Sequence, residues 1–364
     1  MSLLAEMNEK AMTLGIPLTV HIDVTYRCNE RCVHCYLDHD DKGEMSTPEI
    51  KNVLDQLAEA GVFFLVFSGG EVFMRRDFLE LVEYARRLQF NVKVKTNAVM
   101  IHEAEAKRMR ELGVEQVQIS VYSHRAEVHD AITKLPGSLK RTVNSIKFLK
   151  SQGLKVTLSN GLMTVNRQDE AGTHALAREL GVSYTLDPTV TPKLDGDTSI
   201  LSLRVNEDEL ETLFTNPDLV GNVEEYCKAP APVDDDVMEG YSCSAGHTAC
   251  YISPYGDVFP CVQFPLPTGN VRRQKFADIW YRSPQMNEVR SIRVKDLTVC
   301  SSCSHAGSCS RCPGLAYMEG SMRGPSSSDC EKSFHRTGIP SANMLRKAGM
   351  ASGAPLVQIL PMMV

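Results

Sequence analysis

Three cysteines near the start of the chain have the spacing of an iron–sulfur site. Cys28, Cys32 and Cys35 follow the apolar run Leu18–Val24 in the pattern C-x3-C-x2-C. A cubane cluster contains four irons and is usually held by four thiolates, so three thiolates leave one iron open to a ligand that is not protein. Buried structural thiols and a zinc site are the alternatives, although zinc favours four ligands, usually in two separated pairs.

The same triplet resembles the signature of radical S-adenosylmethionine (radical SAM) enzymes. The resemblance implies that the open iron binds SAM through its amino and carboxylate groups. It also implies that an electron from the cluster breaks the sulfonium bond, and that the resulting 5′-deoxyadenosyl radical abstracts hydrogen from a substrate. A low-potential electron donor such as flavodoxin or ferredoxin is then expected as a partner.

A second motif, Gly69-Gly70-Glu71, follows the next strand-like run, Val62–Ser68. It lies at the C-terminal edge of the predicted strands, where the first cluster is expected. Paired glycines let the backbone come close to a ligand, and a carboxylate accepts hydrogen bonds from an ammonium group. The stretch is similar to the family's GGE motif, which implies that Glu71 and its neighbouring backbone bind the amino group of SAM. A glycine-rich turn closed by an acid is the alternative.

Other residues near predicted strand ends are candidates for binding the rest of SAM. Small polar side chains there could bind the ribose, or they could simply close strands and cap helices. Tyr36 could pack on the adenine or belong to the core. The polar candidates are Asn97, Ser120, Ser123 and Asn160. No catalytic acid or base is assigned.

Alternating strand-like and helix-like segments must position these motifs. Runs rich in Val, Ile and Phe are typical of buried parallel strands, and amphipathic stretches between them indicate helices. Six β–α repeats form either an open sheet or a barrel. The radical SAM resemblance favours an α/β fold with a partial (β/α)6 TIM-like barrel and a site at the C-terminal strand ends. The predicted strands are Leu18–Thr25, Val62–Ser68, Val92–Asn97, Val114–Tyr122, Leu154–Met163 and Val182–Leu186.

Nine of the twelve cysteines lie between residues 227 and 330, which indicates a second module. Eight of them match the number that two four-thiolate clusters need, and two C-x2-C pairs also allow a zinc ribbon. The segment from Cys243 to Cys261 is expected to form a β-hairpin that turns near Pro254–Gly256.

This cysteine spacing resembles the SPASM domain, whose members carry two auxiliary clusters and mature peptides and proteins. The resemblance implies three 4Fe–4S clusters in all, one that binds SAM and two auxiliary. Some relatives leave an iron open where Cys250 is assigned, and Cys227 has no assigned partner. The implied ligands are Cys243, Cys250, Cys261 and Cys312 for the first auxiliary cluster, and Cys300, Cys303, Cys309 and Cys330 for the second.

Composition narrows the partners and the compartment. The 364-residue chain has a net charge of −6 and no apolar run of membrane-spanning length, so neither nucleic acid nor a membrane is an expected partner. Clustered cysteines without a secretion signal predict a reducing cytoplasm. The expected parts are a lead-in at 1–17, the radical SAM barrel at 18–204, a helix and linker at 205–240, the SPASM domain at 241–332 and a tail at 333–364.

The leading hypothesis is a radical SAM/SPASM maturase of a ribosomally made peptide. Its product would be a thioether, a carbon–carbon crosslink, an epimer or an oxidised side chain. One alternative is the same chemistry on a small-molecule cofactor precursor of tetrapyrrole or quinone type. Another is a non-catalytic electron-transfer or scaffold protein. Only seventeen residues precede the first predicted strand, too few for an independent domain, so a separate protein is expected to recognise the peptide's leader.

Overall fold

The computed structural model describes residues 3–39 and 42–349, and the chain forms two compact units. The first unit comprises Met1–Arg204 and Ala245–Asn287, and the second comprises Val205–Ser244 and Glu288–Val364. These units follow spatial contacts, and they place Ala245–Asn287 of the predicted SPASM domain with the barrel. The boundaries of the sequence domains stay a prediction.

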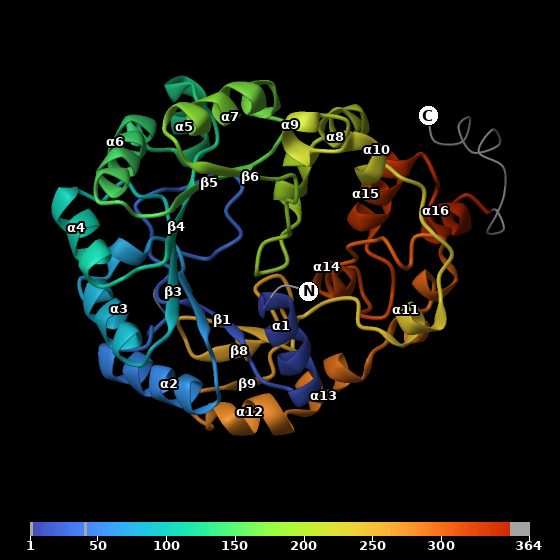
Figure 1. Ribbon diagram of the computed structural model, residues 1–364, viewed down its shortest axis with the longest axis horizontal. Helices are drawn as coiled ribbons and strands as arrows, with labels where there is room; N and C mark the ends of the chain where they lie inside the picture. Colours follow the sequence, from blue (N-terminus) through green and yellow to red (C-terminus); the bar gives the residue numbers. More distant parts are fainter. Residues whose placement is uncertain (1–2, 40–41, 350–364) are drawn as a thin grey trace. The chain divides into compact units, whose positions relative to one another are not determined.

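A nine-stranded sheet forms the frame of the first unit, in the order β6-β5-β4-β3-β2-β1-β7-β8-β9. Its first six strands are parallel, and helices α2 to α7 surround their outer side (Figure 1). The six predicted β–α repeats are therefore confirmed. The strands are β1 (Thr19–Asp23), β2 (Phe64–Ser68), β3 (Asn91–Thr96), β4 (Gln116–Ser120), β5 (Val156–Gly161) and β6 (Ser183–Asp187).

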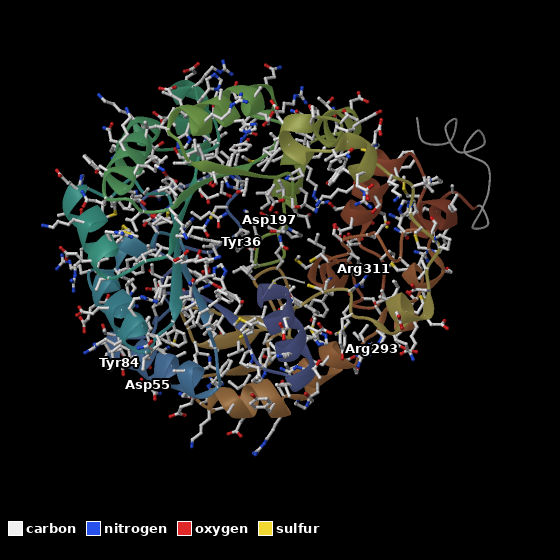
Figure 2. All side chains as sticks on the ribbon, in the orientation of Figure 1. Tyr36, Asp55, Tyr84, Asp197, Arg293 and Arg311 are labelled. Carbon is white, nitrogen blue, oxygen red and sulfur yellow. The ribbon has the colours of Figure 1, made fainter. Side chains whose placement is uncertain are left out.

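Helices on the outer side bury the apolar residues of these strands. Helix α2 begins at a capping box, in which Ser46 N donates to Glu49 Oε2 over 2.7 Å, and its apolar face is fully buried. Neighbouring helices also make polar contacts, since Tyr84 of α3 donates to Asp55 of α2 over 2.8 Å (Figure 2). The helices are α1 (Leu3–Leu14), α2 (Thr47–Glu59), α3 (Phe78–Arg87), α4 (Glu103–Glu111), α5 (Ala126–Thr133), α6 (Ser138–Ser151) and α7 (Glu170–Glu179).

Each strand turns alternate side chains to its two faces, and in β3 the inner face is polar. Val92 and Val94 are buried in the core between sheet and helices. Lys93 and Lys95 alternate with them and are less buried. Strand β3 therefore gives the interior of the barrel groups that can bind a polar ligand.

The predicted hairpin is confirmed, and it extends the barrel sheet. Strand β7 (Ala249–Ile252) pairs with β8 (Asp257–Phe259) in antiparallel fashion, and Gly256 adopts a φ of 88° in the turn. Strand β7 also pairs in parallel with β1. Strand β9 (Gly269–Asn270) and helix α12 (Phe276–Arg282) complete this part, and Trp280 of α12 is fully buried.

The chain before β1 contains a helix. Within the predicted lead-in at 1–17, α1 has 12 residues. Trp280 Nε1 donates to the Gly15 carbonyl just after this helix over 2.6 Å, so the end of the lead-in is fixed against the barrel unit.

Short helices and turns make up most of the second unit. Helix α15 packs against α8, which lies in the segment 205–240 where a helix was predicted and is capped by Asn206. The predicted tail at 333–364 contains the end of α15, from Ser333, and all of α16; residues 350–364 lie outside the described part. The elements are α8 (Glu207–Phe214), α9 (Pro217–Val220), α10 (Val223–Tyr226), α11 (Asp235–Glu239), α14 (Pro313–Met318), α15 (Ser327–Thr337) and α16 (Ala342–Lys347). Helix α13 (Pro284–Ser291) spans the boundary between the units.

Short 3₁₀ helices connect several of these elements. They are η1 (Val72–Met74), η2 (Arg167–Asp169), η3 (Ser199–Leu203), η4 (Val294–Asp296) and η5 (Cys300–Ser302). Among residues 3–39 and 42–349, no helix has the length and apolar character needed to cross a membrane.

Candidate functional site

The three N-terminal cysteines lie on an irregular loop after β1. The loop is anchored to the end of helix α5, because Arg31 N donates to Thr133 O and Val33 N donates to Ile132 O, each over 3.0 Å. All three cysteines line one cavity of about 190 Å³, together with residues from the ends of β2, β3 and β4. The structure thus brings the predicted ligands to the C-terminal edge of the sheet.

The chemistry of these thiols fits a metal cluster. Burial raises the pKa of Cys28 to about 12 and also raises the pKa of Cys32 and Cys35. Without a metal the thiols therefore stay protonated, whereas a bound metal cation deprotonates a coordinating thiol. Within the described ranges, no three His, Cys, Asp or Glu side chains converge closely enough to hold a single ion. A cubane does not require such convergence, since its thiolates attach to different irons around a larger volume.

Gly69 and Gly70 let the end of β2 approach the start of the cysteine loop. A Cβ at Gly69 would lie 2.1 Å from the Thr25 carbonyl oxygen, and one at Gly70 would lie 2.4 Å from the Arg27 carbonyl oxygen. Gly70 N instead donates to Thr25 O over 2.8 Å. Both glycines also line the cavity, so their small size serves the packing of the chain as well as access for a ligand.

Glu71 is buried next to Gly70, Thr96 and Asn97, which line the cavity. The side chain is 1% exposed and accepts hydrogen bonds from Thr96 Oγ1 and Asn97 N, each at 2.8 Å, and from Phe73 N at 3.1 Å. Burial raises its pKa, and these hydrogen bonds oppose the increase. The carboxylate therefore ties the end of β2 to the end of β3. Its binding of the SAM amino group stays a prediction.

Three further candidates line the same cavity. They are Tyr36, Asn97 and Ser120. Asn97 Nδ2 donates to Asn29 Oδ1 over 2.8 Å, which fixes the amide against the cysteine loop. Tyr36 also lines a second cavity of about 200 Å³, and Figure 2 shows it in the interior of the first unit.

Two candidates lie elsewhere. Ser123 is buried and its hydroxyl donates to Asp169. Asn160 is buried and its Nδ2 donates to the Tyr184 hydroxyl over 3.0 Å. Neither residue lines either cavity, so these hydrogen bonds give both side chains a structural task, and their role in SAM binding stays a prediction.

Sequence reasoning missed two residues of the cavity wall, His34 and Lys95. His34 lines both cavities, and its ring centroid lies 4.7 Å from that of Tyr122. Burial lowers the pKa of His34 to about 4, so its ring is neutral at pH 7. Its place inside the cysteine motif was the available signal.

Lys95 gives the cavity a cationic group. Burial lowers its pKa, and Asp23, Cys261 and Asp187 oppose the decrease. Within the described part of the chain, no carboxylate forms an ion pair with its ammonium, whereas other lysines on the surface do. The signal that could have located this lysine on the barrel interior was the alternation Val92-Lys93-Val94-Lys95.

A buried hydrogen-bond network joins the cysteine loop to the hairpin. The Tyr26 and Tyr251 hydroxyls are 2.7 Å apart, and Tyr251 donates to Asp23 Oδ2 over 2.8 Å. His21 Nε2 lies 3.3 Å from Asp23 Oδ1. Tyr251 is on β7, so the network fixes the start of the cysteine loop to the strand that extends the barrel sheet.

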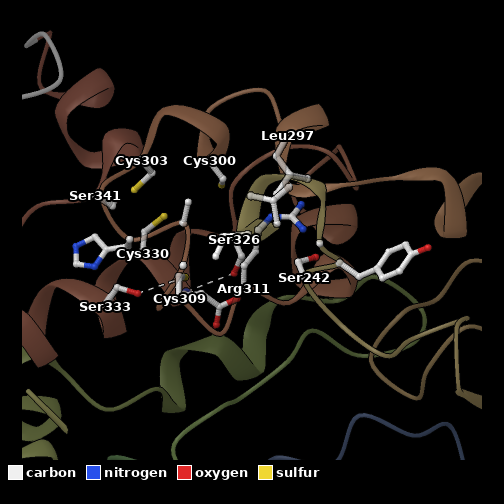
Figure 3. A pocket seen from close by; sticks show the side chains of 18 residues that line it. Ser242, Leu297, Cys300, Cys303, Cys309, Arg311, Ser326, Cys330, Ser333 and Ser341 are labelled. Atoms are coloured by element: carbon white, nitrogen blue, oxygen red, sulfur yellow. Dashed lines mark hydrogen bonds between the residues drawn. The ribbon is translucent and has the colours of Figure 1, made fainter. Parts of the chain in front are cut away.

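The second unit contains a separate four-cysteine site. Its cavity of about 270 Å³ is lined by the four cysteines that the SPASM resemblance assigns to the second auxiliary cluster: Cys300, Cys303, Cys309 and Cys330 (Figure 3). Burial raises the pKa of Cys330 to about 11, with further increases from the other three thiols. These cysteines surround a cavity large enough for several atoms, as a cluster requires.

The first auxiliary set is divided between the two units. Cys243 and Cys312 belong to the second unit, where burial and then the charges of Asp329 and Cys243 raise the pKa of Cys312. Cys250, buried on β7, and Cys261, after β8, belong to the first unit. The ligation of this cluster stays a prediction.

Comparison with known proteins agrees with both motifs. The Radical SAM superfamily matches residues 22–180, and the SPASM family, an iron–sulfur cluster-binding domain, matches residues 243–313. The AdoMet-dependent heme synthase of Methanosarcina barkeri is 26% identical over 332 residues, which cover 84% of this chain and 94% of the relative. The mycofactocin maturase MftC of Mycobacterium tuberculosis (strain CDC 1551 / Oshkosh) is 30% identical over 310 residues, which cover 81% of this chain and 78% of the relative.

A solved structure shows the same fold. Streptococcus suis SuiB bound to the precursor peptide SuiA has a TM-score of 0.70 at 18% identity, over 90% of this chain and 80% of SuiB. The chain therefore belongs to the radical SAM superfamily and carries a SPASM domain. It is an enzyme of that class, and its cofactors are SAM and iron–sulfur clusters. The non-catalytic alternative is set aside.

Proposed function

We propose that this enzyme cleaves SAM at a cluster held by Cys28, Cys32 and Cys35 and modifies a ribosomally made peptide. The observation that carries the proposal is the common cavity of these three thiols with Gly69 and Gly70 at the strand ends. The relatives support the peptide. One is named a mycofactocin maturase, and the structure of SuiB includes its precursor peptide.

Bound together, the cluster and SAM would supply a 5′-deoxyadenosyl radical. The residues of the chain hold and shield these reactants. Glu71 fixes Thr96 and Asn97 on the cavity wall, while the rings of His34 and Tyr36 offer flat surfaces between the two cavities.

The Lys95 ammonium is placed to bind a carboxylate, either that of SAM or that of the substrate. A Lys95→Met variant should bind that partner about 10- to 100-fold more weakly, the range for a lost charge-assisted hydrogen bond. Titration with SAM and then with substrate distinguishes the two sources. Unchanged affinity for both would show that Lys95 binds neither.

Three 4Fe–4S clusters are proposed. The triplet and the second auxiliary set each surround a cavity, and the first auxiliary cluster rests on the SPASM family match. Anaerobic reconstitution should then give about twelve irons per chain at four per cluster. A stable content near four irons, with zinc in the SPASM domain, would contradict this number.

The second candidate substrate is a tetrapyrrole-type precursor. Its support is the similarity to AdoMet-dependent heme synthase over 94% of that relative. The deciding experiment offers the reconstituted enzyme, SAM and a reductant either short peptides encoded beside the gene or carboxylated tetrapyrroles. Mass spectrometry should show a changed peptide that is absent with a Cys32→Ala control. Conversion of the tetrapyrrole alone would favour the second candidate.

A separate leader-recognition protein and a low-potential flavodoxin or ferredoxin are the proposed partners. A disordered leader loses conformational entropy when it docks, which weakens its binding to an open cavity. Adding a small recognition protein should therefore increase peptide modification. Calorimetry with enzyme, peptide and partner tests this, and tight leader binding by the enzyme alone would remove the need for that protein.

A further inference from the structure

Protein donors reach two thiols of the four-cysteine cavity in the second unit. Ser333 Oγ donates to Cys309 Sγ over 3.3 Å, and Ala342 N donates to Cys303 Sγ over 3.4 Å. Cys300 and Cys330 line the same cavity, and Arg311 lines it with them.

Arg311 is a buried cation held rigidly at the wall of this cavity. Its side chain is 5% exposed. Nε donates to Gly324 O over 2.9 Å, and Nη2 donates to Met322 O over 2.6 Å and also to Gly324 O. Nη1 is buried and has no hydrogen-bond partner among the described residues. Figure 3 shows Arg311 among the cysteines.

The other charged groups at this cavity do not neutralise the guanidinium directly. Asp329 Oδ2 accepts a hydrogen bond from Cys312 N at 2.7 Å, and its other oxygen lies 3.8 Å from Lys332 Nζ. His305 Nε2 lies 2.8 Å from the Ile339 carbonyl oxygen. Since an arginine side chain remains cationic, Arg311 is a fixed positive charge beside the four thiols.

We propose that Arg311 raises the reduction potential of the cluster held by Cys300, Cys303, Cys309 and Cys330. This inference rests on the proposed function, in which these cysteines bind a 4Fe–4S cluster. One-electron reduction adds one negative charge to the cluster. A buried cation stabilises that charge more strongly than water-exposed groups would, and cluster potentials respond to net charge, hydrogen bonds to sulfur and exposure.

Redox titration of the reconstituted full-length enzyme, followed by electron paramagnetic resonance, tests the inference. Signals lost in a Cys300→Ser variant identify the cluster. Arg311→Gln removes the charge and should lower the equilibrium constant for reduction about tenfold, or about 59 mV for a one-electron couple. Arg311→Lys keeps the charge and should shift the potential less. Arg323→Gln is the matched control, because that arginine pairs with Glu288 and does not line the cavity.

Asp329→Asn supplies an independent arm, since it removes a negative charge from the same cavity and keeps an oxygen that can accept from Cys312 N. Its cluster should become easier to reduce. An Arg311→Gln protein with full iron content and an unchanged potential would overturn the role of Arg311. If Arg311→Gln does not assemble the cluster, an unchanged potential in Asp329→Asn overturns it instead. A Cys300→Ser protein with the same iron content as the wild type would instead contradict the proposed cluster itself.

Discussion

At the scale of single residues, the buried Glu71 carboxylate already accepts hydrogen bonds from the protein. The GGE resemblance predicted that the carboxylate binds SAM, and the sequence could not show that three donors of the protein already surround it. Those donors come from the end of β3, from Asn97 just after it and from η1, so only the fold reveals them. The glycines were assigned to ligand access, whereas their closest neighbours are Thr25 and Arg27 of the chain itself.

A Glu71→Gln substitution should weaken the folded apoprotein as well as SAM binding. The new amide group would face donors that the carboxylate now accepts from, and a buried unsatisfied group costs about 1–3 kcal/mol. Thermal unfolding of the apoprotein and SAM titration of the reconstituted enzyme measure the two effects. An unchanged unfolding midpoint with weakened SAM binding would show that the carboxylate acts on SAM alone.

At the scale of elements, the sequence predicted features that depend on neighbouring residues better than contacts between distant parts of the chain. The apolar runs located all six barrel strands to within a few residues, because this signal is local. The hairpin was also predicted from its turn. The parallel pairing of β7 with β1 was not predicted. Its partners, such as Val20 and Cys250, lie far apart in the sequence, and no local pattern encodes that contact.

The Tyr251 hydroxyl should stabilise this pairing. Tyr251→Phe removes the hydrogen bond to Asp23 and the contact with Tyr26 and leaves a buried carboxylate less satisfied, which should cost about 1–3 kcal/mol of unfolding free energy. Denaturant unfolding measures the loss. The control is Tyr281→Phe, which alters an exposed phenol and should have little effect. Equal stability of the two variants would mean that the network does not hold β7 to the barrel.

The connection between β4 and α5 should make the barrel sensitive to acid. His129 is buried and its Nδ1 accepts from Tyr122 N over 3.2 Å. Burial lowers its pKa from 6.5 to about 4, against a smaller opposing effect of Asp130. Below pH 6.5 the unfolded chain binds a proton that the folded chain does not, so stability falls as the pH decreases from 6.5 toward 4, by up to about 1.4 kcal/mol per pH unit.

A His129→Gln variant should lose that part of the pH dependence. Denaturant unfolding of both proteins between pH 5 and 7.5 gives the comparison. Parallel stability curves for the two proteins would rule out His129 as the source.

At the scale of the whole molecule, two of the three cysteine sets that the resemblance grouped each line one cavity. The resemblance assigned Cys300, Cys303, Cys309 and Cys330 to one cluster, and they line one cavity. Spacing alone could not separate them from Cys312, which does not line that cavity. Arg311 also lies within this run of cysteines, but nothing in the sequence shows that its side chain is buried at the cavity wall.

Independent cluster sites predict independent loss of iron. A protein with Cys28, Cys32 and Cys35 all changed to Ala should keep about two thirds of its iron, because four irons of three clusters are removed. It should also form no 5′-deoxyadenosine from SAM. Iron analysis and chromatography of the nucleoside test both statements, and deoxyadenosine at the wild-type rate would contradict the assignment of the triplet.

Transfer of deuterium from the substrate to 5′-deoxyadenosine tests the central claim most directly. The reconstituted enzyme is given SAM, a reductant and a candidate peptide deuterated at its carbon positions, and the nucleoside is analysed by mass spectrometry. Radical modification of a peptide predicts deuterated 5′-deoxyadenosine and a changed peptide mass, both lost in the Cys32→Ala control. Undeuterated 5′-deoxyadenosine beside unchanged peptides, with deuterium transfer from a labelled tetrapyrrole instead, would contradict it.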